Sequence, residues 1–495
     1  MSQLSAISRG LAFLRAFYLR ITLISVAMLV PCVWQRHIEA GDLGSHVYNA
    51  WLAQLIGRGQ APGLYLAHLR HNVLFDFLVL HTANLVGFVA AEKIVVSFAV
   101  LIFFWGVFVF ISALVQSPPW FLTPCIATLA YGYSFNMGFL NYYLSIGFAC
   151  WSVALFLGAT RDDRLLSAAI LPIIYLAHPI GFLFAVSAML YLTLRKILPS
   201  YSKLVLPVGA VGAFAFLHWY LGAHTDYDID WSKTGPFYVF NGSDQLVLYG
   251  DQYASLAQLA VFFGVICVVV DAIMRRKERA TKPSAQSWHA FILPTELYAL
   301  TFVVLILLPE NIRTSPEVAW IGLLVSRLTT VSAIFGLAVL ACLKPRKWHA
   351  IGFAALAAAF FVFLHDDAAY LNQIETNAES VLSQLPYGTR VIPTLSAPED
   401  SRIEFVGHLA DRACIHRCFS YLNYEPSSAQ FRVRATPGNK FAAAPYSQVE
   451  KMVSSQYIFQ PEDLPLVQLY ECTGTDRTKL CTRSLHAGDS SKPPQ

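Results

Sequence analysis

The sequence predicts a mainly α-helical, polytopic membrane protein of about 11 spans, followed by a small α/β domain outside the cytoplasm. The first observation is the composition, because 56% of the 495 residues are hydrophobic, 13% are charged, and the mean hydropathy is +0.50. Soluble proteins carry about 25% charged residues. The second observation is that apolar runs of spanning length recur along the chain. The third is that polar residues and four of the nine cysteines gather near the C-terminus.

The spans follow from the apolar runs, since a helix needs about 20 apolar residues to cross a bilayer. Runs near this length cover residues 11–33, 94–115, 120–135, 141–159, 165–178, 180–197, 203–221, 252–273, 291–308, 320–343 and 348–365. We interpret the first run as an uncleaved span, because no small-residue cleavage site follows Val33.

Basic residues predict the orientation, because cytoplasmic loops are rich in Lys and Arg. They lie before the first span and in the loops 161–164, 195–203, 275–282 and 344–347. All these basic segments fall on the cytoplasmic side if an odd number of helices separates a cytoplasmic N-terminus from an outer C-terminal domain. A full span at 72–90 breaks the agreement, so we expect this apolar run to lie along or dip into the outer face. In the alternative arrangement, 72–90 spans and 120–135 does not.

The predicted domains follow from this arrangement. A transmembrane domain covers residues 1–368 and includes outer surface helices at 42–90, an extracytoplasmic α/β domain covers 369–486, and 487–495 form a disordered tail. The cysteines of the second domain are Cys414, Cys418, Cys472 and Cys481. We expect two disulfides in an oxidising compartment. The alternative is a zinc site in which His416 joins these thiols.

The segment after the first span turns abruptly polar at Asp42. Asp42, His46 and Asn49 have the spacing i, i+4, i+7, which places them on one side of a helix. The apolar stripe on the other side contains Val47, Trp51 and Leu55. The pattern predicts an interfacial helix whose apolar side faces lipid headgroups. Asp42 is either a functional carboxylate beside the membrane or the N-cap of this helix.

The other unusual polar residues fall on the same outer side of the predicted topology. They are Arg70, His71, Asp76, Asn141, His178, Arg313 and Arg327. Arg70 and His71 could bind a phosphate or anchor the chain at the membrane surface. His178 is either a turn residue or a ligand. Arg327 lies inside a predicted span and needs a counter-ion, either Glu317, Glu310 or a lipid phosphate.

The arrangement of a first span, an outer acidic loop, many helices and an outer soluble domain resembles the GT-C glycosyltransferases. The matching pieces are Gly41-Asp42 with His46 and Tyr48, residues 72–78, 91–94, 138–143, Ala177-His178-Pro179 and 385–390. The resemblance covers most of residues 11–365 as architecture. The acidic pair usual in that family after the first span is replaced by Gly41-Asp42, which leaves one carboxylate.

The resemblance implies transfer of a sugar from a polyprenyl-phosphate donor to a glycan, lipid or protein acceptor at the outer face of the bacterial cytoplasmic membrane. Asp42 would act as general base. Arg70, His71, Arg313 and Arg327 would hold the phosphate, and His178 and Asn141 would orient the sugar. His46, Asn49 and Asp76 complete the predicted substrate site.

No cofactor is assigned, although a divalent cation could bind, and basic residues spread over short loops argue against nucleic acid as a partner. The alternative function is non-catalytic: a polysaccharide export or assembly protein, or a transporter of lipid-linked glycans.

Overall fold

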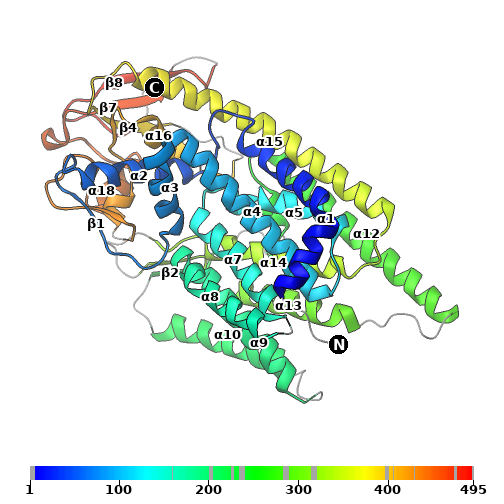
Figure 1. The fold of residues 1–495 in the computed structure, drawn as a ribbon. Coiled ribbons are helices and arrows are strands. Elements are labelled where there is room, and N and C mark those ends of the chain that lie inside the picture. Colours follow the sequence, from blue (N-terminus) through cyan, green and yellow to red (C-terminus); the bar gives the residue numbers. More distant parts are fainter. Residues whose placement is uncertain are drawn as a thin grey trace.

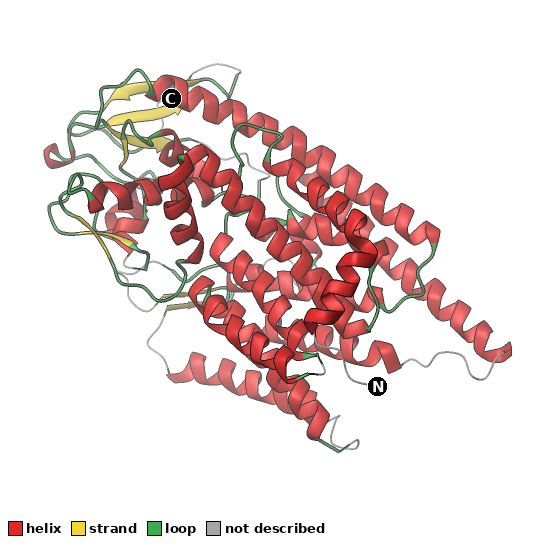
Figure 2. Cartoon of the chain, viewed as in Figure 1, coloured by secondary structure: helices red, strands yellow, loops and turns green. Residues whose placement is uncertain are grey.

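The computed structural model describes residues 6–158, 160–199, 205–224, 228–232, 240–281, 289–313, 320–395, 401–404, 406–428, 430–472 and 476–492. Helices form most of it, and a small group of strands lies at one end of the helix bundle (Figure 2). The prediction of a mainly helical protein is therefore confirmed. Eight described helices are long and apolar enough to cross a membrane, as in a multi-pass membrane protein.

These eight helices lie side by side in the bundle (Figure 1). They are α1 (Ala6–Leu29), α4 (Phe88–Val115), α9 (Pro179–Ile197), α10 (Val205–His224), α12 (Asp251–Thr281), α13 (His289–Leu307), α14 (Leu324–Ala341) and α15 (Lys347–Leu382). The helix α4 shows why such segments are expected to span a membrane. Glu92 and Lys93 are its only charged residues, and apolar side chains cover every side of the rest of the helix.

Three other predicted spans take a different form. Residues 120–135 are divided between η2 (Trp120–Leu122), α5 (Thr123–Ala130) and α6 (Tyr133–Asn136), so the prediction of one continuous helix there is wrong. The chain breaks where Gly132 adopts an extended backbone. The next two runs form α7 (Leu140–Phe156) and α8 (Arg161–Ala177), each of 17 residues.

The segment between α1 and α4 forms α2 (Leu43–Gly57), β1 (Leu64–Leu66) and α3 (Leu74–Val86). The 13 residues of α3 span only about 20 Å at 1.5 Å per residue, against about 30 Å for the hydrocarbon core. Gly87, with φ +82°, separates α3 from α4. The run 72–90 is therefore not one helix of spanning length.

The helix α2 is buried rather than interfacial. Val47, Trp51 and Leu55 are each less than 5% exposed, and the Trp51 ring stacks on Phe419 at 5.6 Å between centroids. The prediction that this apolar stripe faces lipid headgroups is wrong, because the C-terminal part of the chain covers it.

The helix α15 is longer than a membrane is thick. Its 36 residues extend about 54 Å, so its last turns project beyond a hydrocarbon core of about 30 Å. The helix runs unbroken across the domain boundary predicted at residues 368 and 369. Glu375, which pairs with Arg412 of the C-terminal part, therefore lies on a continuation of a spanning helix, as do Asn372 and Glu379.

The C-terminal part contains a four-stranded sheet of order β5-β4-β7-β8, parallel between β5, β4 and β7 and antiparallel between β7 and β8. The strands are β4 (Arg390–Thr394), β5 (Phe419–Ser420), β7 (Val467–Glu471) and β8 (Leu480–Ser484). The other elements of this part are η5 (Val406–His408), α16 (Leu409–Ala413), α17 (Glu425–Ser428), β6 (Val433–Ala435), α18 (Tyr446–Val453) and η6 (Pro461–Asp463).

Two strand pairs tie loops of the helical part together or to the C-terminal part. The strand β1 pairs antiparallel with β6, from Leu64 opposite Ala435 to Leu66 opposite Val433. The strands β2 (Asp228–Asp230) and β3 (Asn311–Arg313) pair antiparallel beyond α10 and α13, and η4 (Ser243–Leu246) precedes α12. The large apolar core is continuous from the helices into the C-terminal part and includes Leu409 and Ala410 of α16.

Candidate functional site

Asp42 lies immediately before α2, but within the described chain its carboxylate makes no hydrogen bond that caps this helix. The backbone there is held instead by the turn after α6, since Gly41 N–H donates to Asn136 O at 2.7 Å and Asp42 N–H donates to Met137 O at 3.0 Å. The side chain of Asp42 is 26% exposed. Its carboxylate is therefore available to a partner other than the helix.

That partner is His408 from the C-terminal part. His408 Nε2 lies 3.6 Å from Asp42 Oδ1, and His408 Nδ1 lies 2.9 Å from Asp411 Oδ2. Burial alone would lower the pKa of His408, but the hydrogen bond and charge of Asp411 and the charge of Asp42 raise it. Asp411 is 1% exposed, so Asp42 is the open end of a carboxylate–imidazole–carboxylate chain.

Glycines make this close approach of segments sterically feasible. A Cβ added at Gly44 would lie 2.6 Å from His408 O, and one at Gly41 would lie 3.1 Å from Glu404 O. Gly138 has φ +77°, a conformation that favours glycine, and a Cβ there would collide with the Asp42 amide. The Gly41-Asp42-Leu43-Gly44 segment thus lets Glu404 and His408 lie directly on the start of α2.

A second polar chain lies on the same side of α2. His46 Nδ1 is 2.7 Å from Asp76 Oδ1 on α3, and Asn141 Nδ2 donates to Asp76 Oδ2 at 2.8 Å. Burial opposes charge on His46, but the charge and hydrogen bond of Asp76 raise the pKa of His46 to about 9. Burial opposes charge on Asp76 too, and His46 nevertheless lowers the pKa of that carboxyl. His46 and Asp76 therefore form a charged, buried pair, and the side-chain amide of Asn141 donates a hydrogen bond to it. All three are among the residues singled out from the sequence.

Asn49 faces the C-terminal part as well. Its Nδ2 donates to Ser45 Oγ at 3.0 Å, and Asn423 Nδ2 donates to Asn49 Oδ1 at 2.9 Å. Ser45 Oγ donates to Glu425 Oε1 at 3.4 Å. Burial and the charge of Asp76 raise the pKa of Glu425 to about 8, so this group is a protonated acid at neutral pH.

Arg327 lies on the first turn of α14. Its guanidinium stacks over the Phe139 ring, with Cζ 4.0 Å from the centroid, while its backbone carbonyl accepts a hydrogen bond from Tyr142 at 2.7 Å. Within the described ranges no carboxylate pairs with this guanidinium, and its Nε is buried without a hydrogen-bond partner. Glu310 instead accepts hydrogen bonds from the first turn of α14, and Glu317 lies outside the described residues.

Two histidines lie near this cation. His178 Nδ1 accepts a hydrogen bond from the Ile180 amide at 3.2 Å and so caps α9, as expected of a turn residue. Its ring packs edge-on against Tyr142, within electrostatic reach of Arg327 and His71. His71 Nδ1 is buried and has no hydrogen-bond partner among the described residues.

Arg313 and Arg70, which were predicted to bind the phosphate, do not lie with Arg327, His178 and His71. Arg313 pairs with Asp228 at 3.1 Å and with Glu450 at 3.7 Å, and it stacks on Trp320. It therefore braces the β2–β3 pair and has no free charge for a ligand. Arg70 is exposed, and the structure gives it no ion-pair partner among the residues it describes.

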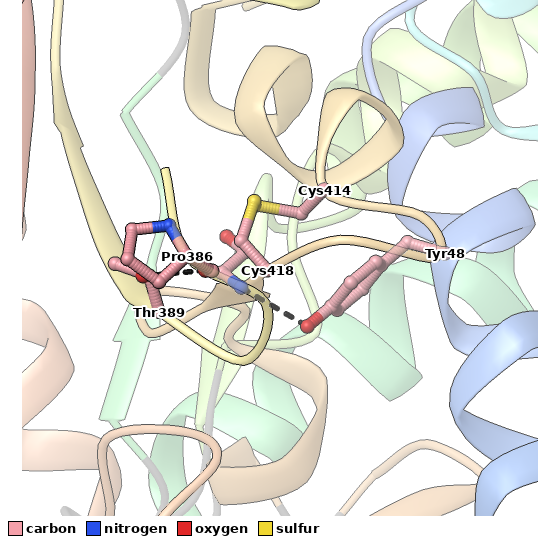
Figure 3. Close-up of a disulfide and its surroundings, with 6 residues drawn as sticks. Tyr48, Pro386, Thr389, Cys414 and Cys418 are labelled. Atoms are coloured by element: carbon pink, nitrogen blue, oxygen red, sulfur yellow. Dashed lines mark hydrogen bonds between the residues drawn. A yellow bond between two sulfur atoms is a disulfide. The ribbon is translucent and has the colours of Figure 1, made fainter. Parts of the chain in front are cut away.

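The four C-terminal cysteines form two disulfides, Cys414–Cys418 and Cys472–Cys481. Figure 3 shows the first beside Tyr48 of α2, whose hydroxyl accepts a hydrogen bond from the Ser420 amide at 3.0 Å. These thiols therefore do not form the alternative zinc site.

One group of described residues has metal-ligand spacing, with His37, Glu375 and Glu379 ligand atoms within 4.8 Å of one another. Glu375 already accepts two hydrogen bonds from the Arg412 guanidinium, and Glu379 pairs with Arg36 at 2.9 Å. Both carboxylates therefore already have an arginine partner, which favours a structural role for this group.

The residues that sequence reasoning missed are His408, Asp411 and Glu425. All three lie in the C-terminal part, where polar residues are ordinary, and no local pattern links them to α2. The i, i+3 spacing of His408 and Asp411 was the one signal in the sequence. Comparison with known proteins gives no match, because no family model, no curated protein and no solved structure is similar to this chain.

Proposed function

We propose that the protein is a membrane glycosyltransferase, which transfers a sugar from a polyprenyl-phosphate donor to an acceptor hydroxyl at the outer face of the cytoplasmic membrane. The observation that carries the proposal is that a partly open carboxylate lies near a buried guanidinium, which has no carboxylate partner among the described residues. Asp42 and Arg327 lie within electrostatic reach of each other, on segments contributed by the start of α2 and the start of α14.

The chemistry of the transfer suits these two groups. The Asp42 carboxylate accepts the proton of the acceptor hydroxyl as its oxygen forms a bond to the anomeric carbon. The bond from that carbon to the phosphate oxygen breaks, and the polyprenyl phosphate leaves with the electron pair. Arg327 then stabilises the charge that grows on the leaving phosphate, because a guanidinium binds phosphate oxygens in bidentate fashion.

The polar neighbours place a positive charge beside Asp42. The raised pKa of His408 favours the imidazolium, which attracts the Asp42 carboxylate. Asp411 holds this imidazole from the other side. His46 and Asp76 neutralise each other, so they contribute shape and hydrogen bonds rather than net charge.

We also propose eleven membrane crossings, with the broken segment from η2 to α6 and the shorter helices α7 and α8 completing the eight long helices. Support comes from where the basic loops lie. Arg195 pairs with Glu296, and Arg275 pairs with Asp271, at helix ends far from the strands (Figure 1). Asp42 lies against His408 of the C-terminal part, on the side proposed to be outside.

The test uses purified protein in lipid nanodiscs, with a panel of polyprenyl-phosphate hexoses and pentoses and release of polyprenyl phosphate as the readout. Asp42→Asn keeps the shape and removes the base, so we expect kcat to fall about 10²–10⁴-fold. The matched control is Asp366→Asn, since the Asp366 side chain is 76% exposed and paired only with an exposed His365.

Retention of activity by Asp42→Asn, or of its ability to complement a deletion strain, would end the catalytic proposal. Binding of donor without turnover by the wild-type protein would instead favour the export, assembly or transport alternative.

A further inference from the structure

Arg412 is the most heavily paired cation among the described residues. It lies on α16, which packs between α2 and the end of α15 (Figure 1). Its Nε donates to Glu375 Oε1 at 2.5 Å, its Nη1 to Glu92 Oε1 at 3.0 Å, and its Nη2 to Glu39 Oε2 at 3.3 Å. One guanidinium thus joins α15, α4 and the loop before α2.

These groups are almost completely removed from solvent. The side chains of Glu39, Glu92 and Glu375 are 6%, 3% and 1% exposed, and that of Arg412 is 8% exposed. Burial and the charge of Glu375 raise the pKa of Glu39 well above its ordinary value, which favours a shared proton in the cluster. Loss of the guanidinium would leave buried carboxylates without a counter-ion, which is strongly unfavourable.

A second arginine anchors the same segment ten residues earlier. Arg402 Nη2 lies 3.1 Å from Asp244 Oδ2, and Nη1 donates to Asp244 O at 2.5 Å. The guanidinium also stacks on Tyr133, with Cζ 3.8 Å from the ring centroid. Asp244 is 1% exposed and accepts a further hydrogen bond from Thr329 of α14 at 2.8 Å.

His408 lies between these two anchors, six residues after Arg402 and four before Arg412. We infer that Arg402 and Arg412 are positioning residues, which lock residues 401–404 and 406–414 into the helical part and thereby hold His408 against Asp42. Asp411, adjacent to Arg412 on the same short helix, fixes the imidazole orientation. The expected effect on turnover rests on the proposed function. The locking of the segment does not depend on that function.

The first measurement is hydrogen–deuterium exchange of the purified full-length protein. In Arg412→Gln we expect the amides of residues 406–414 to exchange about tenfold faster or more, while those of the β2–β3 pair stay unchanged. Arg417→Gln is the matched control, because Arg417 lies five residues further on, is exposed, and its guanidinium donates to Ser383 O alone among the described residues. Equal exchange in Arg412→Gln and the wild type would overturn the inference.

The second measurement is turnover of the polyprenyl-phosphate sugar that the wild type uses. A positioning role predicts that Arg412→Gln lowers kcat about tenfold or more with a small change in KM for the donor, and that Arg412→Lys recovers part of the loss. The doubly substituted Arg412→Gln/Glu375→Gln removes one positive and one negative charge, so it keeps the net charge of the wild-type cluster where the single variant fails to fold.

Full turnover in that double variant would mean that Arg412 acts only through charge balance, and the positioning role would then be wrong. Slow turnover in a folded double variant supports the role. If the wild type transfers no sugar, the proposed function fails, and the exchange experiment still decides whether the segment is locked.

Discussion

Substitution of Gly44 by alanine tests the close contact on which the site depends. The added Cβ would lie 2.6 Å from His408 O, whereas ordinary van der Waals contacts of a Cβ begin at 3.4 Å. The nearest atom belongs to the backbone, so α2 and the segment carrying His408 must separate by about 0.8 Å. A shift of that size takes the 3.6 Å contact between His408 and Asp42 out of ion-pair range.

We expect Gly44→Ala to lower the free energy of unfolding by about 1–3 kcal/mol, as overpacking does elsewhere, and to lower turnover with it. Gly57→Ala, at the end of the same helix, is the matched control because no atom lies within 4 Å of its added Cβ. Helix propensity predicts that this control is neutral or more stable by up to about 1 kcal/mol. The assay is thermal unfolding of both variants in detergent, followed by turnover in nanodiscs. If Gly44→Ala matched Gly57→Ala in both measurements, the packing argument would be refuted.

Three further predictions concern stability. His46 has a pKa of about 9 in the folded chain against an ordinary value of 6.5, so its pair with Asp76 contributes fully below about pH 6.5 and is lost as pH rises through about 9. The wild type should therefore have a higher free energy of unfolding than Asp76→Asn, by about 3 kcal/mol at most, and this difference should shrink as the pH is raised. A difference that stays constant with pH would contradict the prediction. Trp51→Ala should cost about 3–5 kcal/mol in chemical unfolding, because its buried ring fills the interface with the C-terminal part; a loss under 1 kcal/mol would show that the interface closes without it. Replacing both Cys472 and Cys481 by alanine should lower the free energy of unfolding by about 2 kcal/mol relative to the oxidised wild type. The same variant should be as stable as the wild type whose disulfides have been reduced.

Local patterns in the sequence predicted much of the helical part. Long apolar runs predicted the spanning helices because such runs have no stable place in water. The spacing of Asp42, His46 and Asn49 correctly predicted a helix here, with His46 and Asn49 on α2 and Asp42 immediately before it, since helical periodicity depends only on local geometry. The apolar stripe of α2 was misassigned for a related reason. Amphipathicity shows that a face avoids water, but it does not tell whether lipid or another part of the chain covers that face.

Contacts between distant residues could not be predicted in this way. The helix expected over 120–135 breaks because partners elsewhere satisfy its free backbone groups; the Ser134 amide, for example, donates to Gln245 Oε1 at 3.2 Å. His408 reaches Asp42 across most of the chain, and nothing in the sequence around either residue indicates the other.

The pairing of β1 with β6 constrains how the protein is made. Glu92 meets Arg412 across 320 residues of sequence, and Leu64 meets Ala435 across a still longer interval. During synthesis the early loop emerges with its carboxylates unpaired and Trp51 uncovered, and it must wait in that state until the last quarter of the chain is translated. A nascent chain stopped after α15 would insert its helices and still lack half of its site. Prematurely terminated copies would therefore lack His408 and Arg412, and they would expose the apolar face of α2 that the C-terminal part covers.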